Sequence, residues 1–368
     1  MNFRHFYLLA VGFVLSFVFT SSAQVLKAGF DADEYAGTLR RCAQQVGTTY
    51  RGKTPKEEAY QRVYRSPEMG MHNKYDLWLS ADKQIMALNL RGTTSDMGSW
   101  IENFYSAMIP AAGSIKMTDS FTFQYKFAAD PKAMVHTGWT LGVGSLAPDI
   151  EAHIMALYSK GTKQLIVEGH SQGGALAQLL TAYLRYRIAD GKMPKDLVIK
   201  SYCSAAPKTG NLYFAYDFDY ITRGGWAFTV VNAADWVPES PLSLQTIRDF
   251  NTVNPFTNAR PVIKKQKFLL RLYLSHAYRQ LTRNSNKAQR KYEKYLGRVM
   301  YTQVRKFMPQ LQKLKYTGSA NFMRAGTPVV LQPDAAYYQK FPDSGDNIFR
   351  HHLFEPYYYL VDKIYRQQ

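Results

Sequence analysis

The stretch LIVEGHSQGGA, residues 165–175, decides the fold of this 368-residue chain. An apolar run ends at Gly169, Ser171 follows between small residues, and a helical pattern begins at once. Glycines two positions before and after the serine give the pattern G-x-S-x-G, which is typical of a sharp turn from a strand into a helix. Such a turn strains its central residue and needs flanking residues without bulk. We therefore expect Ser171 exposed at the edge of a sheet; an ordinary tight turn is the alternative.

Strands and helices alternate on both sides of this turn. A hairpin over 74–91 feeds a central strand at 85–90. Further strands are predicted at 121–127, 165–167, 198–204, 227–232 and 326–331. Helices are predicted at 31–47, 150–158, 175–188, around 214–216 and at 357–365. This alternation predicts an α/β fold, with a mostly parallel central sheet and helices on both of its faces.

The charge of the chain is concentrated in one segment. The net charge is +18, and residues 260–315 contain sixteen lysines and arginines against one acid, Glu293. Apolar residues at helical spacing within this segment predict two or three amphipathic helices. We expect one α/β domain over 24–368, with a basic helical insertion at about 242–317. The insertion is either a solvated helical cap or a surface that adheres to anionic phospholipid headgroups.

The N-terminus predicts export. Arg4 and His5 precede an apolar run at 6–19, and Ser21-Ser22-Ala23 has the small side chains of a cleavage site. The run is shorter than the roughly twenty residues of a bilayer-spanning helix. We therefore interpret residues 1–23 as a signal peptide of a secreted or periplasmic protein. Nucleic acid is not an expected partner, because no recognition motif is present.

The two cysteines, Cys42 and Cys203, leave two possibilities open. Export permits a disulfide between them. Cys203 lies in a predicted buried strand and Cys42 on a predicted helix, so two buried free thiols are equally compatible. Two cysteines are too few for a disulfide-stapled scaffold or a cysteine-ligated metal site.

A serine hydroxyl becomes a nucleophile only when a base takes its proton and an acid orients that base. In α/β hydrolases the acid follows the serine, and the histidine follows the acid. Asp235 comes directly after the predicted strand 227–232, at the edge of the sheet where ligands bind. Asp217 and Asp219 lie on or beside a helix, and Asp249 lies in an irregular loop. Asp235 is therefore the preferred acid, and a turn or capping aspartate is its alternative role.

Two adjacent histidines, His351 and His352, are the candidates for the base. His5 lies in the leader, His170 adjoins the serine and should point away from it, and His276 lies in the basic segment. The remaining three precede the serine and break the expected order: His72, His136 and His153. The order of the chain does not choose between His351 and His352, and packing beside the aromatic tail is their alternative role.

An oxyanion formed at Ser171 needs two hydrogen-bond donors. One is the backbone N–H of Gln172, the residue after the nucleophile. The other is expected from Arg91-Gly92-Thr93 after the strand at 85–90, where Thr93 offers an N–H and a hydroxyl. This chemistry requires no metal and no cofactor.

Five stretches follow one another in a characteristic order. They are LRGTTS (90–95) with Trp100 after it, VHTGW (135–139), GHSQGGA (169–175), APKTGN (206–211) and VNAADWVP (231–238). Together they resemble the class 3 lipases, the fungal triacylglycerol lipase-like family of α/β hydrolases. The resemblance implies Ser171 as nucleophile, Asp235 as acid, and Thr93 with Gln172 as oxyanion donors.

The resemblance also favours one histidine. The histidine of that family stands before a hydrophobic residue, with a tyrosine a few residues on, and His352 with Leu353 and Tyr357 fits this pattern. His351 remains the alternative base. The basic insertion between Asp235 and His352 departs from the compact family members.

The function that the resemblance implies is hydrolysis of carboxylic ester bonds of lipids through an acyl-enzyme, by a lipase, an esterase or a phospholipase. A feruloyl or polysaccharide esterase is one alternative, and a catalytically silent hydrolase-fold binding protein is another. The natural ester, its acyl-chain length and the oligomeric state stay open.

Overall fold

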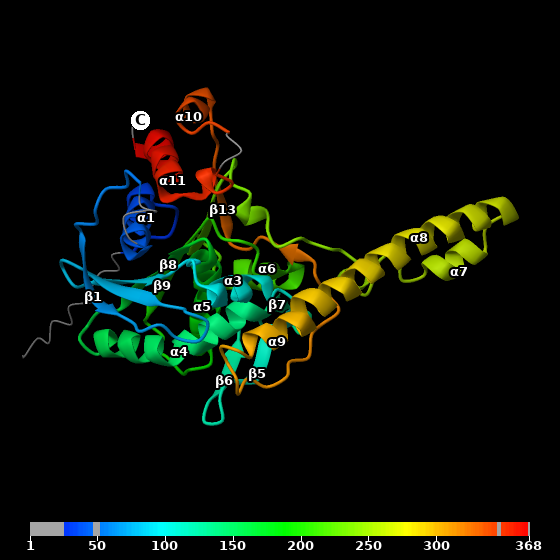
Figure 1. Ribbon diagram of the computed structural model, residues 1–368, viewed down its shortest axis with the longest axis horizontal. Helices are drawn as coiled ribbons and strands as arrows, with labels where there is room; N and C mark the ends of the chain where they lie inside the picture. The colour runs from blue at the N-terminus through cyan, green and yellow to red at the C-terminus, as the bar shows by residue number, and fades with distance from the viewer. Residues whose placement is uncertain (1–25, 47–51, 344–346, 367–368) are drawn as a thin grey trace, which may run out of the picture.

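The central sheet has seven strands in the order β1-β2-β3-β8-β9-β11-β13 (Figure 1). They are β1 (Tyr60–Arg65), β2 (Tyr75–Ser80), β3 (Ile85–Leu90), β8 (Gln164–His170), β9 (Val198–Ser204), β11 (Ala227–Asn232) and β13 (Thr327–Leu331). The first three strands are antiparallel, and β3, β8, β9, β11 and β13 run parallel. The sheet belongs to a computed structural model that describes residues 26–46, 52–343 and 347–366. The predicted mostly parallel α/β sheet is confirmed, and the predicted signal peptide lies outside the described residues.

Helices cover both faces of the sheet. On one face lie α1 (Ala32–Val46), α10 (Ala335–Lys340) and α11 (Phe354–Val361), and on the other lie α4 (Thr137–Tyr158), α5 (Gln172–Ala189) and α6 (Leu212–Ile221). Because successive side chains of a strand point to opposite faces, Ile166 packs with the first group while Leu165 and Val167 pack with the second. The result is a three-layer α/β/α body with a core on each side of the sheet.

Smaller elements lie beside the body. A four-stranded sheet contains β4 (Met108–Pro110), β7 (Met134–His136), β10 (Gly210–Asn211) and β12 (Phe322–Met323). A hairpin joins β5 (Ala112–Lys116) to β6 (Thr122–Lys126), and α3 (Met97–Phe104) follows β3. The predicted strand at 121–127 therefore exists, but it lies outside the central sheet.

One predicted helix is longer than its pattern indicated. The helix expected at 150–158 is α4, which already begins at Thr137. Three glycines and Pro148 obscure its first half. The glycines let the helix pack closely: a Cβ on Gly138 would lie 1.9 Å from the backbone oxygen of Glu102. Close packing against buried groups, rather than helix propensity, stabilises this part of the helix.

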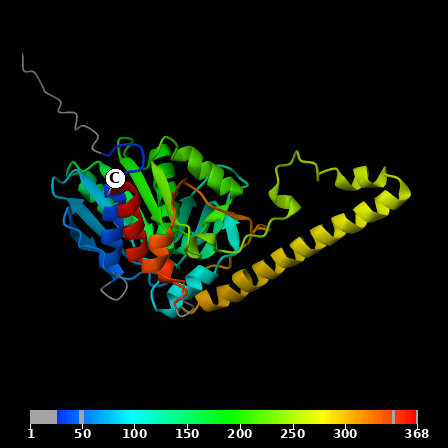
Figure 2. The ribbon, with the colours of Figure 1, turned by 90° about the horizontal axis from the view of Figure 1, so that it is seen from above.

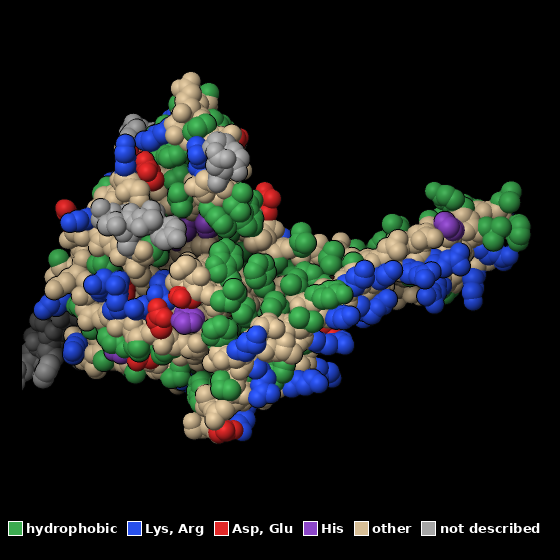
Figure 3. Space-filling model, viewed as in Figure 1, with side chains coloured by type: hydrophobic (Ala, Val, Ile, Leu, Met, Phe, Trp, Pro, Cys, Tyr) green, Lys and Arg blue, Asp and Glu red, His purple; other side chains and the backbone are tan. Residues whose placement is uncertain are grey.

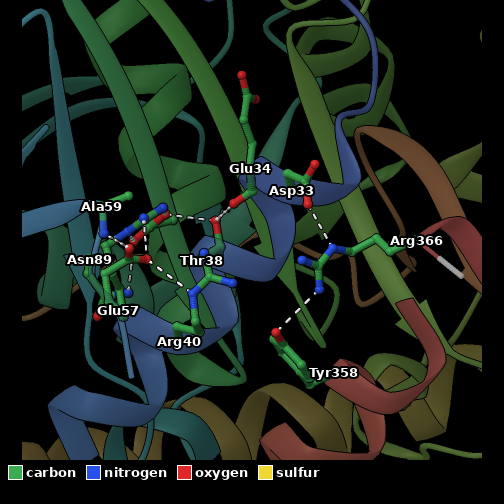
Figure 4. A network of polar contacts seen from close by, with 11 residues as sticks. Asp33, Glu34, Thr38, Arg40, Glu57, Ala59, Asn89, Tyr358 and Arg366 are labelled. Carbon is green, nitrogen blue, oxygen red and sulfur yellow. Dashed lines mark hydrogen bonds and ion pairs between the residues drawn. The ribbon is translucent and has the colours of Figure 1, made fainter. Parts of the chain in front are cut away.

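A buried polar network fixes β8 against α1 (Figure 4). Arg41 donates to both carboxylate oxygens of Glu168 at 2.7 Å and to Glu57 at 3.0 Å. Thr38 and Asn89 donate to the same Glu168 carboxylate, at 2.7 and 3.3 Å. Since a buried carboxylate is stable only when it is paired and hydrogen-bonded, this network holds the strand that leads into the serine turn.

Both cysteines are buried free thiols, so the unpaired alternative is the one that the structure has. Among the described residues, no helix combines the length and the apolar character that crossing a bilayer requires.

The basic segment forms a long helical projection (Figures 1 and 2). It consists of α7 (Ala259–Lys264) and α8 (Phe268–Glu293), followed by a π-helical turn (Lys294–Val299) and α9 (Met300–Val304). The base of α8 is attached to the body, where the hydroxyl of buried Tyr292 lies 2.8 Å from that of Ser106. The rest of α8 extends away from the sheet and does not cover the serine turn.

Candidate active site

Ser171 lies at a strained turn between β8 and α5. Its backbone has φ 61° and ψ −129°, a conformation that residues other than glycine rarely adopt. A Cβ on Gly169 would lie 2.2 Å from the oxygen of Gly173, and a Cβ on Gly173 would lie 2.1 Å from the oxygen of Leu90. These contacts explain why glycine occupies both positions. The turn leaves the Ser171 side chain partly exposed.

The loop after β3 touches this turn. A Cβ on Gly92 would lie 2.9 Å from the His170 carbonyl oxygen and 3.6 Å from Ser171 Cβ. The next residue, Thr93, is positioned by Asn103, whose Nδ2 donates to the Thr93 hydroxyl at 2.9 Å. Thr93 thus directly follows the residue that touches the serine turn, and Asn103, which holds its hydroxyl, is a residue that the sequence did not indicate.

Gln172, the first residue of α5, is held by its side chain. Its Oε1 accepts from the Ser99 hydroxyl and its Nε2 donates to Glu102, both at 3.0 Å. Asn73 donates to the other oxygen of Glu102 at 2.6 Å. Burial raises the pKa of Glu102 to about 8, although these hydrogen bonds act in the opposite direction. The N–H groups of the first turn of a helix have no intrahelical partner, so the Gln172 N–H is available beside Ser171.

Asp235 and His352 meet at the carboxyl edge of the sheet. The distance between Asp235 Oδ2 and His352 Nδ1 is 2.7 Å, and the Tyr357 hydroxyl donates to the same oxygen at 2.8 Å. The N–H of Val237 donates to the other oxygen at 3.0 Å. Burial alone would raise the pKa of Asp235, but the charge of His352 and these hydrogen bonds outweigh it, so the pKa lies below its ordinary value. Asp235 is therefore an ionised acceptor for His352.

The neighbouring histidine faces elsewhere. His351 Nε2 lies 2.7 Å from Asp343 Oδ1, and its Nδ1 lies 2.7 Å from the Tyr337 hydroxyl. Both ring nitrogens are thus engaged away from Asp235. Of the two candidates for the base, the structure places His352 beside the candidate acid.

His170 contacts the backbone of His352. Its Nε2 lies 2.7 Å from the His352 carbonyl oxygen, and its Nδ1 lies 3.0 Å from the Ser204 hydroxyl. Burial, with a smaller contribution from His352, lowers the pKa of His170 to about 3. The ring is therefore neutral at pH 7, with Nε2 donating to the carbonyl and Nδ1 accepting from Ser204. Both ring nitrogens of His170 are thus engaged by Ser204 and by the backbone of His352, and the second of these contacts could not be foreseen from neighbouring positions in the sequence.

The rival acids have structural partners. Asp217 accepts from the Tyr186 hydroxyl at 2.5 Å, Asp219 accepts from the Gly326 N–H at 2.6 Å, and Asp249 caps a short turn by accepting from Thr246. These are the helix and loop roles that their sequence positions indicated.

The other histidines have roles of their own. His136 caps α4 and stacks on Trp139 at 3.6 Å, while His153 stacks on Tyr64 at 3.8 Å. His276 lies exposed on α8. Of the histidines considered for the base, His352 is the one that lies beside Asp235.

An aromatic wall lies next to His352. We use this name for Trp100, Phe104, Trp236 and Phe349. The Phe349 ring lies 6.0 Å from the His352 ring, 5.5 Å from Trp236 and 6.3 Å from Trp100. Phe104 and Trp236 are about half exposed. A partly exposed apolar surface beside polar groups is typical of a site for an apolar ligand.

One group of side chains has the composition of a metal site. Ligand atoms of Glu68, His72 and Asp96 lie within 4.8 Å of one another. Arg91 already pairs with Glu68 at 2.8 Å, and Glu68 lies 3.0 Å from His72 Nδ1. Because these pairs account for the contacts of the cluster, we assign no metal to it.

Comparisons with known proteins identify proteins that are similar to this chain. Residues 87–245 match the family model described as lipase (class 3). The secreted mono- and diacylglycerol lipase 1 of Fusarium solani is 31% identical over 170 residues, which cover 44% of this chain and 47% of that protein. A secreted mono- and diacylglycerol lipase of Malassezia restricta is 40% identical over 76 residues, covering 21% of this chain and 23% of that protein.

Among solved structures, a triacylglycerol lipase from Penicillium expansum shares 20% sequence identity, with a TM-score of 0.41, over 58% of this chain and 77% of that one. The chain spans about half the length, or less, of the curated relatives given above. The region 87–245, which contains Ser171, Asp235 and Thr93, is therefore similar to the class 3 lipase family.

Proposed function

We propose that this chain is an exported serine hydrolase that cleaves carboxylic ester bonds of lipids, with Ser171 as nucleophile, His352 as base and Asp235 as acid. The observation that carries the proposal is the 2.7 Å hydrogen bond between His352 and Asp235, which joins residues 117 positions apart. The contact of His170 with the His352 backbone brings this pair to the residue that precedes Ser171. Nucleophile, base and acid thus come from three separate parts of the chain.

The hydrogen bonds support a role for each atom in the proposed mechanism. His352 Nδ1–H donates to Asp235, so Nε2 carries the free electron pair. As Ser171 Oγ attacks the ester carbonyl, Nε2 takes its proton and then passes it to the departing alcohol oxygen. A water molecule, deprotonated by the same Nε2, then attacks the acyl-enzyme carbonyl. The bond to Ser171 Oγ breaks, Nε2 returns the proton to Oγ, and the carboxylic acid is released. The N–H groups of Thr93 and Gln172 stabilise the oxyanion in both steps.

The surroundings of His352 and the names of the relatives support the proposed substrate class. The aromatic wall offers an apolar surface, which suits the acyl chain of a lipid ester. The two curated relatives are named as secreted mono- and diacylglycerol lipases. We therefore favour acylglycerols over phospholipids, feruloyl esters and ligands that are bound without turnover.

The same relatives support export through the leader at 1–23. We also propose that residues 24–368 form a single hydrolase domain, into which the segment at about 242–317 is inserted. An exported enzyme would meet lipid outside the compartment in which it was made.

Replacing the nucleophile tests the proposal. In Ser171→Ala, hydrolysis of a short p-nitrophenyl ester should fall by roughly 10⁴-fold or more, because no acyl-enzyme can form. Circular dichroism should be unchanged, and a fluorophosphonate probe should label the wild type but not the variant. Unchanged hydrolysis in the variant would refute the mechanism. An unlabelled, inactive wild type would point to a binding protein, and faster turnover of feruloyl ester than of diacylglycerol would refute the lipid substrate.

A further inference from the structure

The projecting arm, residues 259–288, has no buried face. None of the residues of α7 is buried, and the only buried residues of α8 are Gln289 and Tyr292, which lie beyond this range. A surface helix normally buries an apolar stripe against its own domain. Here large apolar side chains remain exposed where α8 begins: Phe268, Leu269, Leu272 and Tyr273. An apolar tip of this kind points to a surface outside the chain.

The arm is also strongly basic. Residues 259–288 contain eight lysines and arginines and no acid. The next residue that could neutralise them, Glu293, pairs with Arg298 at 2.7 Å. Figure 3 shows Lys and Arg side chains along one edge of α8 and hydrophobic side chains gathered at its far end. Charge and apolar surface are thus combined on a single projecting element.

A groove between α7 and α8 concentrates this charge. Its volume is about 520 Å³. Five cations line it: Arg260, Lys264, Arg279, Arg283 and Arg290. The other lining residues are neutral and supply hydroxyl groups, one amide and one apolar side chain: Ser275, Tyr278, Thr282, Asn286 and Ile263. Guanidinium, ammonium and hydroxyl donors without any carboxylate match the oxygens of a phosphate group.

We propose that the arm docks on an anionic phospholipid surface, with headgroup phosphates in the groove between α7 and α8 and the apolar tip inserted among the acyl chains. Each Lys or Arg close to such a surface contributes on the order of 1 kcal/mol to binding. Exposed apolar residues add the hydrophobic contribution that peripheral helices use. Nucleic acid would use the charge but would leave Phe268 and Leu269 exposed, so a bilayer accounts for both features.

The length of the arm determines where the surface would lie relative to the body. A helix of 26 residues is roughly 39 Å long, and the tip is held away from the body that carries Ser171 (Figure 2). Lipid binding by the arm does not depend on ester hydrolysis. The two proposals can therefore fail separately.

Vesicle sedimentation with the full chain tests the docking. The Ser171→Ala background prevents hydrolysis of the vesicles. The chain should bind to vesicles of phosphatidylcholine mixed with phosphatidylglycerol. It should bind much less to vesicles of phosphatidylcholine alone. Neutralising four groove cations should weaken binding at least tenfold: Arg260→Gln, Lys264→Gln, Arg279→Gln and Arg283→Gln. A matched control removes four exposed lysines from the body and should change binding less than twofold: Lys56→Gln, Lys160→Gln, Lys192→Gln and Lys195→Gln.

A second variant separates lipid from nucleic acid. Replacing Phe268, Leu269 and Leu272 by serine should weaken vesicle binding and leave binding to duplex DNA unchanged. Equal vesicle binding by the groove variant and its control would overturn the proposal. It would also be overturned if duplex DNA bound more tightly than the vesicles and the tip variant lost no vesicle binding. Short-ester hydrolysis by the same arm variants with Ser171 restored, together with their circular dichroism, shows whether the body is still folded.

Discussion

Two regions of the molecule use polar side chains in opposite ways. One is the arm, and the other is the carboxyl edge of the sheet with Ser171, Asp235 and His352, which we call the site edge. At the site edge, Asp235 is buried and accepts hydrogen bonds from His352, Tyr357 and a backbone N–H. Along the arm, eight cations lie on an element in which residues 259–288 are not buried. The buried carboxylate of the first region has its hydrogen-bond partners within the chain. The charged and apolar side chains of the second region are not buried against the rest of the chain.

This difference suits the two regions to different tasks: a reaction at the site edge, and attachment to a surface by the arm. Buried hydrogen-bonded groups hold a fixed geometry, which a reaction at one serine requires. Exposed cations are screened by salt and adapt to many arrangements of anions, as binding to a fluid surface requires. Changes at the site edge should therefore affect turnover and stability, and changes on the arm should affect binding to surfaces.

The largest effect is expected from the two adjacent histidines. His352→Ala should lower kcat for a soluble ester by roughly 10⁴-fold or more, because the serine loses its base. His351→Ala should lower kcat by less than about threefold, because its ring nitrogens bond to Tyr337 and Asp343 instead. Steady-state kinetics of both variants measures the contrast.

Thermal unfolding of the same two variants serves as the control, since His351 links two segments of the tail. If His351→Ala were as inactive as His352→Ala while still folded, the assignment of the base would be wrong.

The sequence predicted the site edge far better than the arm. The G-x-S-x-G spacing, the strand before it and the strand before Asp235 all depend on local rules, so Ser171 and Asp235 could be placed on their elements in advance. Chain order alone did not separate His351 from His352, because the choice depends on which ring reaches Asp235 in three dimensions.

Other parts of the structure were beyond local rules. The support of His352 by His170, and of Thr93 by Asn103, arises only from packing between distant segments. The basic helices were expected, but nothing in their periodicity indicated that α8 would extend away from the sheet. An amphipathic pattern predicts that one face of a helix is buried, but it does not identify the surface that buries it.

The intermediate effect concerns Glu102, the buried acid that binds the Gln172 side chain. Burial raises its pKa to about 8 from 4.5. Between these values the folded chain holds a proton that the unfolded chain has lost, so the free energy of unfolding falls as pH rises from 4.5 to 8. Each pH unit costs on the order of 1.4 kcal/mol. Glu102→Gln removes this loss and should be the more stable protein at pH 8.

Urea unfolding at pH 5, 7 and 9 checks this expectation. The gain in stability of Glu102→Gln over the wild type should grow with pH, whereas Glu58→Gln, at an exposed carboxylate, should show no such growth. A gain that is independent of pH would mean that Glu102 is ionised in the folded protein, and the site edge would then contain an unneutralised buried charge.

The smallest effect should occur on the arm, and a matched pair of leucines isolates it. Leu176 in α5 is fully buried, and Leu269 in α8 is 79% exposed. Leu176→Ala should lower the free energy of unfolding by about 2–5 kcal/mol, because it opens a cavity in the core. Leu269→Ala should change it by less than about 0.5 kcal/mol, because that side chain is exposed in the folded chain too. A loss above 1 kcal/mol for Leu269→Ala that disappeared on dilution would show that a second copy of the chain covers the tip, and the tip would then not be free for lipid.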